Sequence, residues 1–164
     1  MNSTRDEILE VLARYARAVD ARDAAAVADV FAEHGREILR DDGVETATVV
    51  LELVGPDEIA AAVRDVVGPL PPRVATHHTT HDHIVRVDGD TATIDAQFMV
   101  HEARGAVRPD DGWPAHASGG QGEIVVAEIG HYRMTLTRID GTWRIIVNDV
   151  TLDLPLALPT ETLD

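Results

Sequence analysis

Hydrophobic residues in the first part of the chain recur at helical spacing. The first such stripe predicts an amphipathic helix that ends near Asp20, with apolar positions at Ile8, Val11, Leu12, Tyr15 and Val19. Thr4 and Glu7 have the spacing of a capping box at its start. A second helix is expected after the N-cap residue Asp23, with an end at residues 33–35 and apolar positions at Val27, Val30 and Phe31.

A third helix is predicted to begin in the segment Gly55-Pro56-Asp57-Glu58. Proline suits the first turn of a helix, and acidic residues suit the positive end of the helix dipole. The proline-rich segment 68–72 should end this helix, whose apolar positions are Ile59, Ala62, Val63, Val66 and Val67.

The remaining chain consists mostly of extended, valine- and threonine-rich segments separated by turn residues. The pattern predicts a hairpin over residues 38–53, around Asp42-Gly43, and then long strands over 74–87, 91–103, 122–138 and 143–154. A polar loop connects residues 105 and 122, and loops of this length are often functional. The last residues, 155–164, are expected to form a loosely ordered tail.

Helices followed by consecutive antiparallel strands indicate an α+β fold. We expect the N-terminal helices to pack on one face of a curved, mostly antiparallel sheet, with a pocket for a small molecule between the two layers. The 164 residues contain no repeat and no linker, so residues 1–164 are expected to form a single domain.

Composition excludes several classes of function. The net charge of −15 opposes binding to nucleic acid and to anionic membrane surfaces. The chain has no cysteine, and all 14 basic residues are arginine, so thiol nucleophiles and Schiff-base lysines are excluded. Neither Ser3 nor Ser118 lies in a G-x-S-x-G elbow, and no G-x-G-x-x-G run occurs. Because the N-terminus has no apolar signal region, a cytoplasmic location is expected.

Four of the eight histidines lie between Thr76 and Val87, at the start of a predicted strand, namely His77, His78, His81 and His83. Histidine has the side-chain pKa nearest neutrality, so such a cluster suits proton transfer or metal binding. The alternative is that these side chains are solvated polar positions along a strand edge.

Several strings resemble the SnoaL-like branch of the nuclear-transport-factor-2-like superfamily. In chain order they are YARAVDARD at 15–23, VFAE at 30–33, GPDEI at 55–59, the segment 77–90 and the segment 130–145. The resemblance covers about residues 4–154 and implies a cone-like α+β barrel whose helices enclose a deep, mainly apolar pocket. The superfamily includes dehydratases, a dehydrochlorinase, isomerases, cyclases and proteins without catalytic activity, so the fold does not define the function.

The same resemblance implies the positions of the catalytic residues. The aspartate near the end of the first helix corresponds to Asp20, the tyrosine before it to Tyr15, and the histidine at the start of a strand to His78 or, with a slip of one, to His77. His101 matches a second pocket histidine on the following strand. A carboxylate bonded to histidine fixes its tautomer and stabilises its charged form, which suits a general base.

Each of these residues also has a structural interpretation. Asp20 could be an exposed helix end or a cap for the second helix, Tyr15 could simply pack in the core, and His101 could lie at a strand edge. Further substrate-binding positions are expected at Phe31, Phe98, Trp113, His131 and Asn148. Trp113, in the long loop, would then be a lid residue; alternatively, its ring only packs against its neighbours.

Strand alternation creates a conflict for His78. If Val85 and Val87 face the core, then His81 and His83 face it too, whereas His78 points away. A β-bulge near Thr79-Thr80 would return His78 to the pocket. Either this bulge exists, or another histidine of the cluster is the functional one.

Three functional hypotheses follow. The first is a cofactor-independent lyase of the dehydratase type, or an isomerase, acting on a small apolar cyclic molecule without a metal. The second is a non-catalytic small-molecule-binding module or partner subunit of the same fold. The third is a metal site in which His81 and His83 share an ion with a carboxylate from elsewhere. Superfamily members often form oligomers, so the resemblance allows a homodimer or homotrimer.

Overall fold

The computed structural model describes residues 3–41 and 47–156. In chain order the elements are α1 (Thr4–Asp20), α2 (Ala24–Asp29), β1 (Phe31–Asp41), β2 (Thr48–Val54), α3 (Pro56–Ala62), the π-helical turn η1 (Val63–Val67), β3 (Val74–Asp88), β4 (Thr91–Gly105), β5 (Gly122–Ile139) and β6 (Thr142–Leu152). The α+β fold expected from the hydrophobic pattern is therefore confirmed. The expected turn at Asp42-Gly43 and most of the expected tail lie outside the described residues.

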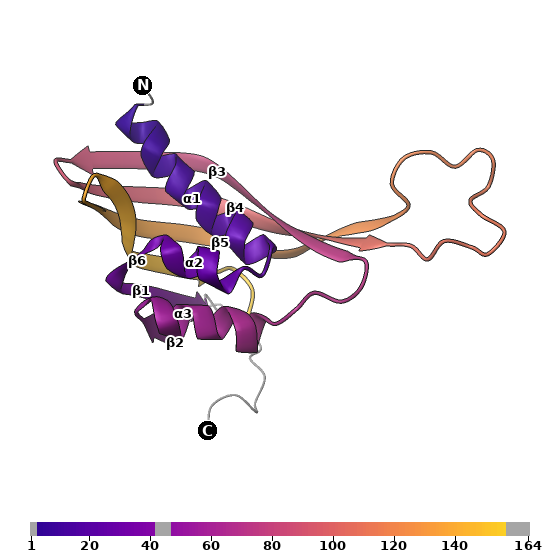
Figure 1. Ribbon diagram of the computed structural model, residues 1–164, viewed down its shortest axis with the longest axis horizontal. Helices are drawn as coiled ribbons and strands as arrows, with labels where there is room; N and C mark the ends of the chain where they lie inside the picture. The colour runs from indigo at the N-terminus through magenta and orange to yellow at the C-terminus, as the bar shows by residue number, and fades with distance from the viewer. Residues whose placement is uncertain (1–2, 42–46, 157–164) are drawn as a thin grey trace.

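The six strands form one curved sheet in the order β2-β1-β6-β5-β4-β3. Neighbouring strands are antiparallel except β1 and β6, which are parallel. The sheet does not close into a barrel, since β2 and β3 remain its two edges. All the helices cover one face, with α1 over the β3 side and α3 beside β1 and β2 (Figure 1). The core therefore lies between these two layers.

The helix boundaries differ from the predicted ones at two places. Ser3 rather than Thr4 caps α1, because its hydroxyl accepts from the Asp6 backbone N–H while the Asp6 carboxylate accepts from Ser3. Helix α2 is shorter than expected and ends at Asp29. Phe31 then begins a strand that pairs with Ile145 on β6. Sheet pairing has outweighed the helical pattern of this short segment, which periodicity alone cannot classify.

Strand β3 contains the β-bulge that would return His78 to the pocket, but the bulge follows His81 instead of lying at Thr79-Thr80. The pairing of β3 with β4 shifts between His81 and Ile84, and Asp82 adopts a left-handed conformation with φ of 53°. Before the bulge, Thr76 and His78 face the helices, and after it Val85 packs against the core. The same shift leaves Ile84 exposed on the outer face.

The far ends of β4 and β5 extend beyond the helices as a two-stranded ribbon. The loop that joins them, around residues 106–121, lies at the tip of this ribbon, away from the helices (Figure 1). Trp113 belongs to this loop and is exposed. Among residues 3–41 and 47–156, none of the helices combines the length and apolar character of a membrane span.

Gly130 of β5 lies where β4 and β6 approach too closely to leave room for a side chain. A Cβ atom there would meet the Thr151 backbone oxygen at 2.2 Å and the Phe98 ring at 3.0 Å. We therefore expect Gly130→Ala to lower the free energy of unfolding by about 1–3 kcal/mol, the usual cost of overpacking. Urea denaturation measures this change.

Gly120→Ala is the matched control, because a Cβ at Gly120 would meet no atom within 4 Å. Its free energy of unfolding should stay within about 0.5 kcal/mol of wild type, as for most surface changes. Equal stability of the two variants would contradict the close approach at Gly130.

Candidate active site

The end of α1 meets β3 through Asp20 and His78. One oxygen of the Asp20 carboxylate lies 2.6 Å from His78 Nδ1, and the other accepts the His78 backbone N–H at 2.9 Å. The side chains are only 17% and 8% exposed, respectively. Asp20 is therefore not an exposed helix end, and the cap of α2 is Asp23 instead.

This contact determines how the imidazole can act. Asp20 is an acceptor, so Nδ1 carries the proton that joins the two side chains. In the neutral ring the lone pair then lies on Nε2, and a charged ring would be stabilised by the carboxylate. Such an arrangement can serve as a general base with its orienting group.

His78 lines a cavity of about 450 Å³ between the helices and the sheet. Its apolar wall includes Val19, Leu39, Val66, Val67, Val100, Phe98, Val150 and Leu152. Its polar groups are Tyr15, Arg22, Glu37, Thr76, His78, Glu102, Glu128 and Tyr132. Among them, Thr76 Oγ1 is buried without a hydrogen-bond partner in the described part of the chain, so it can bond to a ligand.

A second polar couple in this cavity consists of Tyr15 and Glu37. The Tyr15 hydroxyl donates to Glu37 Oε1 at 2.7 Å. Burial raises the pKa of the Glu37 carboxyl to about 7, although the Tyr15 hydrogen bond opposes the rise. Burial, followed by the nearby Glu37 charge, also raises the pKa of Tyr15 well above its usual value. Near neutral pH, Glu37 is thus poised between its acid and carboxylate forms.

Aromatic rings connect the two couples along the cavity. The His78 and Phe98 ring centroids lie 6.1 Å apart, and Phe98 stacks on Tyr132 at 4.3 Å. Tyr132 in turn contacts the Tyr15 ring edge-to-face at 5.8 Å. The pKa of Tyr132 is raised, first by burial and then by the Glu37 carboxylate. These contacts hold Tyr15 and His78 on one continuous aromatic surface.

Several residues predicted to lie in the pocket are placed elsewhere. His101 lies on the outer face of the sheet, where its Nδ1 is 3.4 Å from the Thr79 hydroxyl, because Val100 and Glu102 take the inward positions of β4. His131 lies on the outer face too, 3.5 Å from the Asp153 carboxylate.

Three further predicted positions have different surroundings. Phe31 is buried in the core, where its ring centroid lies 6.1 Å from that of Tyr15 in an edge-to-face arrangement. Trp113 is exposed and does not line the cavity, so it is not a lid in this structure. Asn148 is fully buried on β6, in register with Glu37. Its side chain acts to lower the pKa of Tyr15, but burial and the Glu37 charge raise that pKa by more.

The bulge also separates the two histidines of the metal hypothesis. His81 contacts the Asp82 carboxylate at 2.9 Å on the surface, whereas His83 bonds to the Thr80 hydroxyl at 3.0 Å. Burial, more than the nearby Arg5 charge, lowers the pKa of His83. In the described parts of the chain, no three His, Cys, Asp or Glu side chains gather as metal ligands would. The cluster therefore lacks a ligand set.

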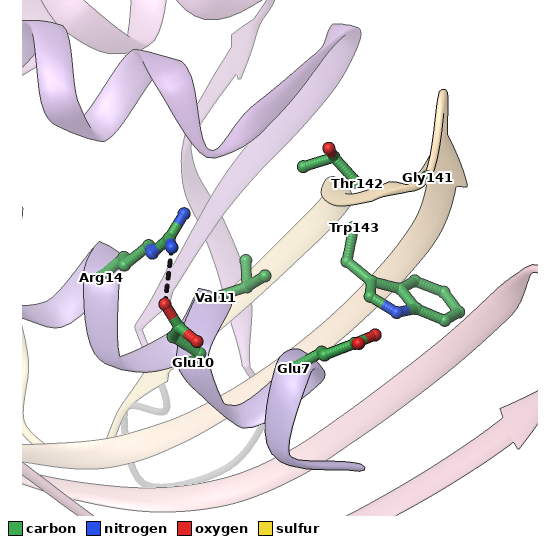
Figure 2. Close-up of a pocket in the computed structure, with 7 residues that line it drawn as sticks. All are labelled: Glu7, Glu10, Val11, Arg14, Gly141, Thr142 and Trp143. Carbon is green, nitrogen blue, oxygen red and sulfur yellow. Dashed lines mark hydrogen bonds and ion pairs between the residues drawn. The ribbon is translucent and has the colours of Figure 1, made fainter. Parts of the chain in front are cut away.

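A separate hollow lies between α1 and the turn that joins β5 to β6 (Figure 2). Its carboxylates are neutralised, since Glu10 bonds to Arg14 at 2.5 Å and Glu7 bonds to Arg138 at 3.0 Å. Trp143, which forms one side of the hollow, is 4% exposed and packs in the core near the start of β6. This hollow contains no acid–base couple comparable to those of the cavity.

Glu37 is the main site residue that sequence reasoning did not find. The predicted hairpin began at residue 38, so Glu37 fell outside any strand. With β1 starting at Phe31, Glu37 and Leu39 are alternate positions on the inner face. The signal that indicates Glu37 is a carboxylate among apolar residues on one face of a strand. It can be recognised only when the strand is known to begin at Phe31.

The raised pKa of Glu37 predicts how stability depends on pH. Between about pH 4.5 and 7 the unfolded chain has ionised Glu37 while the folded protein keeps its proton, so stability falls as pH rises and then levels off above pH 7. The total loss is on the order of 3 kcal/mol. Urea denaturation of wild type and Glu37→Gln at pH 5 and 8 measures it.

In that comparison, the stability of wild type relative to Glu37→Gln should decrease from pH 5 to pH 8. Other titrating groups are common to both proteins and cancel in the difference. A constant difference between the two proteins would show that Glu37 ionises normally in the folded state.

Solved structures share this fold at low sequence identity. An NTF2-like protein with a cystatin-like fold from Novosphingobium aromaticivorans aligns with a TM-score of 0.62 and 23% identity, over 90% of this chain and 80% of its own. A protein from the same organism, described as the β subunit of a proposed aromatic-ring-hydroxylating dioxygenase, aligns with a TM-score of 0.66 and 15% identity, over 95% and 92%.

A Catenulispora acidiphila protein in complex with S-DNPA aligns with a TM-score of 0.61 and 18% identity, over 90% of this chain and 92% of its own. These similarities establish the fold alone. No curated protein matches the chain. The family model of the SnoaL-like domain matches residues 2–147. The chain therefore belongs to the SnoaL-like domain family.

Proposed function

We propose that the protein is a cofactor-independent lyase of the dehydratase type, or an isomerase, that acts on a small and mostly apolar cyclic molecule. The observation that carries this proposal is the 2.6 Å contact between the Asp20 carboxylate and His78 Nδ1 in the wall of the cavity. A general base requires such a contact with its orienting group.

The reaction begins with proton abstraction from carbon. His78 Nε2 takes the proton of a substrate C–H bond, and the Asp20 carboxylate stabilises the resulting imidazolium. Asp20 also accepts the His78 backbone N–H, so the carboxylate cannot rotate away from the ring without losing two bonds. This preorganisation reduces the cost of reaching the reactive geometry.

The electron pair released from carbon needs an acceptor. In a dehydration it forms a C=C bond as the C–O bond breaks, and the leaving oxygen takes up a proton. In an isomerisation the pair is held at an oxygen until the proton returns to another carbon. Tyr15, whose hydroxyl lies in the cavity and donates to Glu37, is the residue proposed to assist the leaving or developing oxyanion. His101, on the other face of the sheet, is no longer part of this proposal.

The cavity wall supports the proposed substrate class. Most lining residues outside the two couples are aliphatic, which favours an apolar ring system with few polar substituents. One protein of this fold, from Catenulispora acidiphila, is in complex with S-DNPA.

The alternative function is a non-catalytic binding module or partner subunit. Its support is the fold similarity to a protein described as a β subunit of a proposed dioxygenase. An apolar cavity without an acid–base couple would favour it, whereas Asp20 and His78 are in direct contact. A binding module would return its ligand unchanged after long incubation.

We expect Asp20→Asn and His78→Ala each to lower kcat by roughly 10²–10⁴-fold on any substrate that the wild type turns over, the range typical of acid–base groups. Turnover should be screened with hydroxylated and unsaturated cyclic compounds, by chromatography of substrate and product. Circular dichroism checks that each variant remains folded.

His77→Ala is the matched control, because His77 is the adjacent histidine but is exposed on the opposite face of β3. It should retain wild-type kcat. Full activity in both Asp20→Asn and His78→Ala would disprove the acid–base mechanism, and the binding-module function would then be preferred.

A further inference from the structure

Glu37 is surrounded differently from the two arginines of its strand. Its neighbours Arg36 and Arg40 form ion pairs with Glu52 and Asp149. Glu37 points to the inner face, where its hydrogen-bond partner is the neutral Tyr15 hydroxyl and no arginine forms an ion pair with it in the described residues. A carboxyl group buried without a cation is costly when ionised, so such a site favours its protonated form.

Glu37 and His78 enter the cavity from strands on different sides of it. Glu37 lies on β1 and His78 on the edge strand β3, with β6, β5 and β4 between them. Adjacent strands lie about 4.8 Å apart, so the two groups contact different parts of a bound molecule even in a curved sheet. The stacked rings of Phe98 and Tyr132 form the surface between them.

We propose that Glu37 is the proton donor of this site and that its carboxyl group, positioned by Tyr15, protonates an oxygen atom of the ligand at the end opposite His78. This inference rests on the proposed function and identifies the acid of that reaction. It also restricts the substrate to an uncharged, elongated molecule with an oxygen function at one end and the reactive C–H bond toward the other.

The proton balance of the step is complete. The C–H bond breaks, its proton moves to His78 Nε2, and its electron pair enters the substrate. The ligand oxygen gains electron density and forms an O–H bond with the proton of Glu37, which becomes a carboxylate. In an isomerisation the imidazolium of His78 then gives its proton to another carbon, while the O–H proton returns to the Glu37 carboxylate. In a dehydration the electron pair forms a C=C bond, the C–O bond breaks, the protonated oxygen leaves as water, and the His78 proton returns to Glu37 through water. Tyr15 remains protonated, as its raised pKa requires.

Binding of a ketone probe tests the donor without any turnover. The probe is 2-acetylnaphthalene labelled with ¹³C at the carbonyl carbon, whose NMR resonance moves downfield when the oxygen accepts a strong hydrogen bond. In wild type we expect a downfield shift below pH 7 that is lost as the pH rises through about 7, where Glu37 ionises.

The Glu37→Gln variant should give a smaller shift that does not depend on pH, because the amide is a weaker donor and does not titrate. Glu52→Gln is the matched control, since Glu52 is an exposed glutamate on the adjacent strand and should behave as wild type. Tyr15→Phe should move the transition to higher pH, because the Tyr15 hydrogen bond lowers the pKa of Glu37. A purely structural role of Tyr15 would leave the transition unchanged.

The pH dependence must be separated from the other charged groups that face Glu37 across the cavity. These are Tyr15 of α1, Arg22 of the following turn, His78 of β3 with its partner Asp20, Glu102 of β4, and Glu128 and Tyr132 of β5. Any transition due to these groups would persist in Glu37→Gln. Persistence of the wild-type transition in that variant would overturn the assignment, as would failure of the wild type to bind or shift the probe. Since the readout needs no reaction, it is independent of whether lyase or isomerase activity is found.

Discussion

The candidate site depends on one carboxylate that joins a helix to a sheet edge. Asp20 ends α1 and accepts both the backbone N–H and the ring of His78, so a single side chain fixes the position of the helix on β3 and the orientation of the imidazole. Because α1 is rigid, the same contact places Tyr15, just over one turn earlier, above the aromatic rings of the sheet. Removing the Asp20 carboxylate would therefore affect both couples of the cavity.

The cavity exists because the sheet curves without closing. Strand β1 runs parallel to β6 and brings Glu37 to the inner face, whereas β3, an edge strand of the sheet, carries His78. The helices close this concave face from one side (Figure 1). The result is a cavity that two polar pairs enter from separate elements, and burial there accounts for the raised pKa of Glu37.

Much of this arrangement could be predicted from the sequence. The strands after residue 74 follow alternation and turn residues, and their predicted ends lie within two residues of those observed. The contact of Asp20 with His78 was expected only through family resemblance, since residues 58 positions apart leave no local signal. Phe31 was assigned to the wrong element because a short apolar run fits a helix or a strand. Glu37 was missed for the same reason, because its inward position depends on that strand.

The bulge at Asp82 divides β3 into two halves whose side chains alternate in opposite phase. An insertion or deletion of one residue there would exchange the inward and outward sets of one half relative to the other. His77, Thr79 and His81 would replace Thr76, His78 and Thr80 on the inner face of the sheet, without any substitution in the strand itself. The first half of β3 thus carries two alternative sets of side chains, one on each face. A change of one residue in length at position 82 would be an evolutionary route by which one set replaces the other in the cavity.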